Sequence, residues 1–209
     1  SYRTTSLPNN EKAISVSYYD ELIIALSSSG RVYMSKNVES FNPTFSEVYK
    51  LKNIHIVNIS GGFTHAFAVS NDGKVYGIGI NYFSKLGLSK DIEKVEDFVQ
   101  ILSLSRYKIL EAYAGRHHSL FRTSQGKILA CGSNFLGEFP NVSPGKTDYF
   151  DPIDTGLSGA SFCIEIQLYF KLNNWERNRN FIMLRSLFII LFFIMLRSLF
   201  IAMNLIHKN

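Results

Sequence analysis

The chain has 209 residues, of which 46% are hydrophobic, and a formal net charge of +5. Of its 22 Lys and Arg and 17 Asp and Glu, 16 basic and 15 acidic residues precede residue 160, so the basic excess lies in the C-terminal part. Because the charges of the first part are balanced and interspersed, we expect no nucleic acid to bind there. Cys131 and Cys163 are too few for a disulfide framework or a four-cysteine zinc site, which favours an intracellular, cytoplasmic or nuclear protein.

The first predicted unit, residues 13–40, has two β-prone runs around a turn at Gly30. In the run before the turn, Leu22, Ile24 and Leu26 alternate with other residues, which predicts a strand with one apolar face. The second unit, residues 54–90, repeats this arrangement around Asn71-Asp72-Gly73, a sequence typical of a tight β-hairpin turn.

The connection after the second unit has a different periodicity. Between Asp91 and Leu104, the apolar residues Ile92, Val95, Val99 and Leu102 recur at helical spacing. This spacing predicts one or two helical turns between the second unit and the third unit, residues 107–140.

The second and third units match each other at a fixed offset of 53 residues. A constant offset at several positions identifies an internal repeat. The matching pairs are Gly62 and Gly115, His65 and His118, Gly73 and Gly126, Gly79 and Gly132, and Asn81 and Asn134.

These residues, with Leu86-Gly87 after Asn81, resemble the repeat of the regulator of chromosome condensation family. The resemblance extends over residues 14–157 and is faintest in the first unit, where Tyr19 and Leu22 replace the glycine and histidine. Members of that family fold as seven-bladed β-propellers of four-stranded blades. The resemblance therefore implies an all-β domain over residues 1–159, a partial propeller of about three units, with the repeated positions in structural roles.

Each repeated residue type also has a chemical alternative. The histidines could titrate or bind a metal, but they occupy the same place in successive repeats, which favours a buried structural role. Gly77 and Gly79 form only half of a dinucleotide-binding fingerprint, and Cys131 lies in a predicted strand, where cysteine packs as a small hydrophobic residue. We therefore expect no catalytic residue, no cofactor and no metal ion.

The C-terminal part departs from the repeat. Residues 160–180 read as an incomplete strand and a polar linker, and residues 181–209 as a hydrophobic segment predicted to form an apolar helix. Phe181 to Ile206 is long enough to cross a membrane, with the repeat domain then on the cytoplasmic side. The nine residues from Phe181 recur from Phe193, which equally suits a truncated or frame-disturbed repeat gene; packing of the segment over the open face of the repeats is a third alternative.

The resemblance implies a protein-interaction module of the propeller type, as a fragment or truncated member, because propeller loops present side chains on a rigid scaffold. Two alternatives stay open: guanine-nucleotide exchange on a small GTPase, as in the founding member of the family, or a membrane-anchored or non-functional remnant. The expected partner is a protein, with a small GTPase as one candidate.

Overall fold

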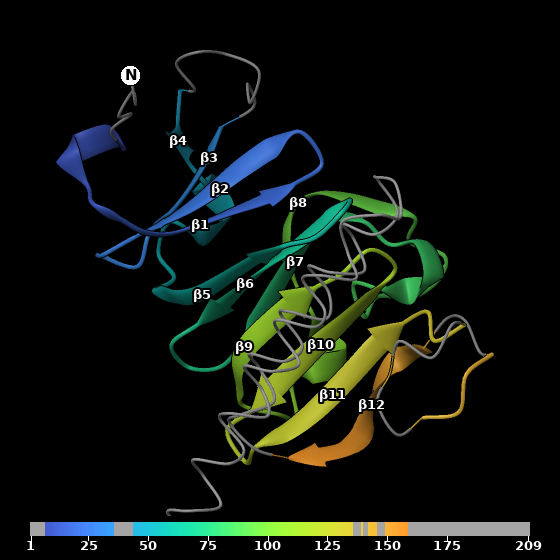
Figure 1. Cartoon of the computed structure of the whole chain (residues 1–209). Helices are drawn as coiled ribbons and strands as arrows, with labels where there is room; N and C mark the ends of the chain where they lie inside the picture. The colour runs from blue at the N-terminus through green and yellow to red at the C-terminus, as the bar shows by residue number, and fades with distance from the viewer. Residues whose placement is uncertain (1–6, 36–43, 136–138, 140–141, 146–148, 159–209) are drawn as a thin grey trace, which may run out of the picture. The chain divides into compact units, whose positions relative to one another are not determined.

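A computed structural model describes residues 7–35, 44–135, 139, 142–145 and 149–158, all within one compact unit, Ser1–Ile164 (Figure 1). The predicted linker, C-terminal helix and possible membrane segment, residues 160–209, and the second cysteine lie outside these residues. Among the residues that the structure describes, no helix is long and apolar enough to cross a membrane.

The all-β prediction is confirmed: the strands form three antiparallel sheets of four strands each, in sequence order within each sheet (Figure 1). The first sheet contains β1 (Ala13–Tyr19), β2 (Leu22–Ser27), β3 (Val32–Ser35) and β4 (Ser46–Glu47). The second contains β5 (Ile56–Gly61), β6 (His65–Ser70), β7 (Val75–Ile80) and β8 (Lys94–Gln100). The third contains β9 (Ile109–Ala114), β10 (His118–Thr123), β11 (Lys127–Gly132) and β12 (Tyr149–Ser158).

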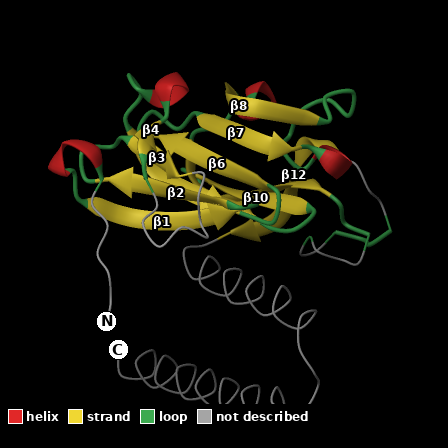
Figure 2. Ribbon diagram, turned by 90° about the horizontal axis from the view of Figure 1, so that it is seen from above, coloured by secondary structure: helices red, strands yellow, loops and turns green. Residues whose placement is uncertain are grey.

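Helix is confined, in the described part of the chain, to short 3-10 turns before the first strand and between later strands (Figure 2). These turns are η1 (Pro8–Asn10), η2 (Tyr49–Leu51), η3 (Tyr82–Ser84) and η4 (Leu102–Leu104).

The prediction of helical turns between Asp91 and Leu104 is wrong for the centre of that range, which forms β8, and only η4 at its end is helical. β8 pairs with β7 from Ile80↔Lys94 to Tyr76↔Gln100. The backbone groups on the outer edge of β7 need hydrogen-bond partners, and an adjacent strand supplies them. The strand also packs on both faces, with Phe98 in one apolar core cluster and Val95 against the other, so its apolar residues need no helical period.

The segment from residue 151 to 157, which follows the third predicted unit, belongs to the last strand of the third sheet. It forms most of β12, which pairs with β11 through Leu129↔Asp154 and Ala130↔Ile153. Each four-stranded sheet therefore extends beyond the hairpin unit predicted from the sequence.

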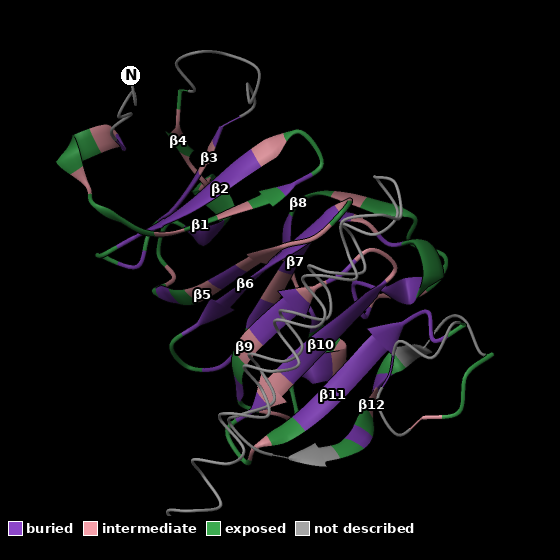
Figure 3. Ribbon diagram, in the orientation of Figure 1, coloured by how far each residue is buried: buried purple, intermediate pink, exposed green. Residues whose placement is uncertain are grey.

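The two inner strands of the central sheet, β6 and β7, are largely buried (Figure 3). Along β6, Ala66 and Ala68 pack in the core cluster shared with the first sheet, whereas Phe67 and Val69 pack in the cluster shared with the third sheet. The Phe67 and Phe121 rings meet edge to face, with their centres 5.1 Å apart. Neighbouring repeats thus bury each other's apolar faces, as stacked repeats must.

The first strands of neighbouring sheets also join by hydrogen bonds at equivalent positions. The Gly61 amide donates to Ser17 Oγ at 2.7 Å, and the Ala114 amide donates to Ser60 Oγ at 3.0 Å. A Cβ on Gly61 would lie 2.0 Å from the Tyr18 carbonyl oxygen. Between the first two sheets, only glycine permits this close approach.

Candidate protein-interaction surface

The repeated histidines lie at equivalent places, at the start of β6 and β10, in two different sheets. His65 pairs with Gly79, and His118 pairs with Gly132. Both glycines have positive φ, +106° and +102°, and a Cβ on either would lie within 2.5 Å of a backbone carbonyl oxygen. The glycine opposite each histidine therefore lets the two paired strands approach each other closely at this end of the sheet.

His65 is fully buried and belongs to a chain of hydrogen bonds between the second and third sheets. Its Nε2 lies 2.8 Å from Ser119 Oγ, and the Ser119 hydroxyl donates to the Lys85 carbonyl oxygen at 2.6 Å. Because that hydroxyl has only one hydrogen, His65 Nε2 carries the proton and donates to Ser119. Burial, followed by the nearby Lys85 ammonium, lowers the pKa of His65 well below its usual value and keeps the ring neutral.

His118 is buried in the equivalent place of the third sheet. Its ring meets that of Phe139 edge to face, and a Cβ on Gly115 would lie 2.6 Å from its Nε2. Burial, followed by the charges of His117 and Lys85, lowers the pKa of His118 to about 3. The described residues contain no group of three or more His, Cys, Asp and Glu that could hold a metal ion, and the expectation of no catalytic residue stays a prediction.

Lys85 is a buried cation that the sequence analysis did not single out. Its side chain is 1% exposed, and Nζ donates to Thr64 Oγ1 at 2.5 Å and to the Arg116 carbonyl oxygen at 3.2 Å. These two bonds tie the loop after β7 to the turns that precede β6 and β10. Burial lowers the pKa of the Lys85 ammonium to about 8. In the sequence, only its place next to Leu86-Gly87, which belongs to the repeat pattern, could have indicated that Lys85 has a structural role.

Asn81 holds the same loop from inside. Its side-chain amide donates to the carbonyl oxygens of Leu88, Ser89 and Ile92 at 2.8–3.2 Å, and its Oδ1 accepts from the Leu86 amide at 2.9 Å. Asn134 repeats this arrangement in the third sheet, donating to the carbonyl oxygens of Val142 and Ser143 and accepting from the Phe139 amide. Each asparagine therefore satisfies the polar backbone of an irregular loop.

The remaining repeated positions lie elsewhere. Gly73 and Gly126 occupy the hairpin turns at the opposite end of the sheets, with φ of +87° and +79°. A Cβ on Gly62 would lie 2.3 Å from the Gly115 carbonyl oxygen, so these two glycines lie where adjacent repeats meet. Cys131 is buried, its thiol donates to the Lys85 carbonyl oxygen at 3.3 Å, and burial raises the pKa of that thiol.

Above this buried network lies a cluster of exposed aromatic and half-buried basic side chains, which we call the aromatic loop surface. Phe83 and Ser84 have positive φ, 63° and 57°, a rare conformation for a bulky residue that is found mostly at functional sites. The side chains touch one another: the Arg116 guanidinium lies 5.1 Å from the centre of the Phe63 ring, and the ring centres of Phe83 and His117 are 5.3 Å apart. The surface consists of Phe63, Tyr82, Phe83, Arg116 and His117.

Large apolar rings on this surface remain in contact with solvent. Phe63 is 56% exposed, Tyr82 57% and Phe83 39%. Phe135, 60% exposed, follows Asn134 as Tyr82 follows Asn81. Aromatic residues and arginine are the types that contribute most binding energy at protein interfaces, so this surface is suited to contact another protein. The sequence analysis missed it because its members come from three separate turns and loops.

Comparison with known proteins gives the same assignment as the repeat pattern. A family described as the regulator of chromosome condensation (RCC1) repeat matches residues 56–84 and 112–138. The chain is 32% identical to the ultraviolet-B receptor UVR8 of Arabidopsis thaliana over 88 residues, 42% of this chain and 20% of the receptor. It is also 32% identical to the guanine nucleotide exchange factor SRM1 of Saccharomyces cerevisiae over 81 residues, 37% of this chain and 17% of that protein.

Among solved structures, human WBSCR16 is similar in fold, with a TM-score of 0.59 and 17% identity over 71% of this chain and 40% of that one. The chain spans about a fifth of the length of the two curated relatives. The chain therefore forms a partial propeller, and its second and third units are repeats of the regulator of chromosome condensation family.

Proposed function

We propose that the chain is a protein-interaction module and that the aromatic loop surface is its binding site. The observation that carries this proposal is the exposure of Phe63, Tyr82 and Phe83 beside Arg116. Rings that stay in water gain free energy when a partner covers them, by roughly 25 cal/mol per Å² of apolar surface removed from water.

The buried network beneath the surface supports the same proposal. Lys85 and Asn81 fix the loop that carries Tyr82 and Phe83, so little conformational entropy is lost when a partner binds. The strained backbone at Phe83 persists because these hydrogen bonds hold it on both sides.

A site-specific crosslink tests the proposal. With Tyr82 replaced by a photo-crosslinking phenylalanine analogue, we expect one discrete protein adduct on irradiation in a lysate of the source organism. The adduct should disappear in the double variant Phe63→Ala, Arg116→Ala, whose thermal melting should stay within a few degrees of the parent because Phe63 is exposed and Arg116 is only half-buried.

The matched control is Tyr49, which is 82% exposed and lies in the connection before β5, at the other end of the sheets. The same analogue at position 49 should give no such adduct. Equal adducts from both positions, or an adduct at position 82 that survives the double variant, would contradict a specific site.

The alternative function is catalysis of nucleotide exchange on a small GTPase, supported by the similarity to SRM1, whose name states that activity. Against it stands the small share, 17%, of that protein that the chain spans. We expect that the chain, at micromolar concentration, leaves release of labelled GDP at the intrinsic rate across a panel of small GTPases, while a complete exchange factor accelerates it. Acceleration by this chain that is lost in the Phe83→Ala variant would make nucleotide exchange the better proposal.

A further inference from the structure

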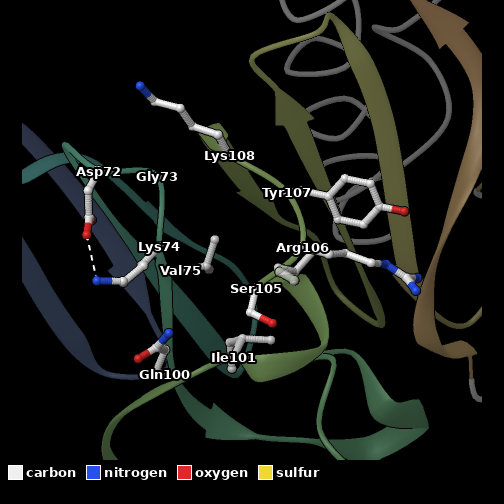
Figure 4. Close-up of a pocket in the computed structure, with 11 residues that line it drawn as sticks. Asp72, Gly73, Lys74, Val75, Gln100, Ile101, Ser105, Arg106, Tyr107 and Lys108 are labelled. Carbon is white, nitrogen blue, oxygen red and sulfur yellow. Dashed lines mark ion pairs between the residues drawn. The ribbon is translucent and has the colours of Figure 1, made fainter.

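A pocket of about 270 Å³ opens at the other end of the sheets, between the turn that joins β6 to β7 and the connection from β8 to β9 (Figure 4). Its floor is apolar, formed by the buried side chains of Val75, Ile101 and Leu104. Its rim is polar and carries three basic residues, Lys74, Arg106 and Lys108. The pocket and the aromatic loop surface lie at opposite ends of β6.

Among the residues that the structure describes, two of the three rim cations have no carboxylate partner. Lys74 Nζ lies 2.7 Å from the Asp72 carboxylate, which neutralises it. Arg106 lies 5.1 Å from the centre of the Tyr107 ring, and neither Arg106 nor Lys108 forms an ion pair with any carboxylate of the described residues. Figure 4 shows Lys108 extending beside Gly73 and Arg106 extending on the opposite side, beside Tyr107. The free positive charges therefore flank the apolar floor.

The volume indicates the kind of ligand. Pockets for small molecules usually measure about 300–1,000 Å³ and enclose most of the ligand. This pocket lies just below that range, so it suits one apolar side chain of a longer ligand. The cations on both sides then favour negative charge before and after that side chain.

We propose that this pocket binds an extended acidic peptide segment, with one apolar side chain on the floor of Val75, Ile101 and Leu104 and carboxylates facing Arg106 and Lys108. The site is independent of the proposed aromatic loop surface, because it uses neither its residues nor its end of the sheets.

The test uses the full chain and a fluorescein-labelled peptide with one leucine between two pairs of glutamates, titrated by fluorescence anisotropy at low salt. We expect saturable binding that the double variant Arg106→Glu, Lys108→Glu weakens about tenfold or more, since each exposed ion pair contributes up to several-fold in affinity. Replacing the leucine with serine should also weaken binding about tenfold, through loss of apolar burial.

The matched control is Lys52→Glu, an exposed lysine in the equivalent connection between the first two sheets. It should leave binding unchanged, as should Phe63→Ala with Arg116→Ala. Absence of saturable binding, an equal loss in Lys52→Glu, or equal affinity of the leucine and serine peptides would overturn the proposal.

Discussion

Acidification from pH 7 to pH 5 should lower the free energy of unfolding by about 2 kcal/mol through His118 alone. Its pKa is about 3 in the folded chain and 6.5 in the unfolded chain. Between those two pKa values the unfolded chain binds a proton at this histidine and the folded chain does not. The free energy of unfolding therefore falls as the pH falls below 6.5, by about 1.4 kcal/mol per pH unit. His65, whose pKa is also lowered by burial, acts in the same direction.

Urea denaturation followed by circular dichroism at the two pH values measures the effect, with His118→Gln as the matched variant. Glutamine does not titrate, so the variant should lose about 2 kcal/mol less than the parent on acidification. At pH 7 it should itself be about 1–3 kcal/mol less stable, because a packed, buried group is replaced. An equal loss in parent and variant would show that His118 does not govern the acid response.

The chain should self-associate through the outer face of β1, and Val16→Lys should weaken that association about tenfold or more. The hydrogen bonds from Gly61 to Ser17 and from Ala114 to Ser60 show which residues of β1, β5 and β9 are equivalent. By this correspondence Val16 matches Ile59 and Ala112. The preceding sheet leaves those two residues only 6% and 1% exposed, whereas Val16 is 55% exposed.

An apolar sheet face with an open strand edge favours association with another chain. In a solution of the purified protein, the available partner is a second copy of the same chain. Full burial of one valine contributes at least about 1.5 kcal/mol, which corresponds to more than tenfold in affinity. Light scattering of the full chain over a range of concentrations measures this. Val57→Lys is the control, because Val57 lies on β5, is 47% exposed and is not on the open face. The same oligomer distribution in parent and Val16→Lys would refute the role of β1.

Repetition in the sequence made the fold predictable. The offset of 53 residues between matched glycines, histidines and asparagines is visible in the sequence alone, because each of these positions meets the same steric or hydrogen-bonding requirement in both repeats. Gly79 and Gly132 lie where a Cβ would strike a backbone carbonyl, and Asn81 and Asn134 each hold an irregular loop. Local steric and hydrogen-bonding requirements of this kind leave a residue-type signature.

The fourth strand of the second sheet was not predictable in the same way. The apolar residues between Asp91 and Leu104 suit a helix when that segment is considered alone. The open edge of β7 and the two apolar cores on either side of β8 make it a strand instead. Tertiary contacts override local periodicity here because they satisfy both the backbone and the side chains.

The sequence by itself determined the hairpins and the repeat, since these depend on short segments that recur at a fixed offset. Only the tertiary structure brought together the candidate sites. Lys85 joins Thr64 and Arg116 across two repeats, and the pocket forms where the turn at Gly73 meets Lys108. These groups are distant in sequence, and they meet because the sheets stack closely enough to bury each other's apolar faces.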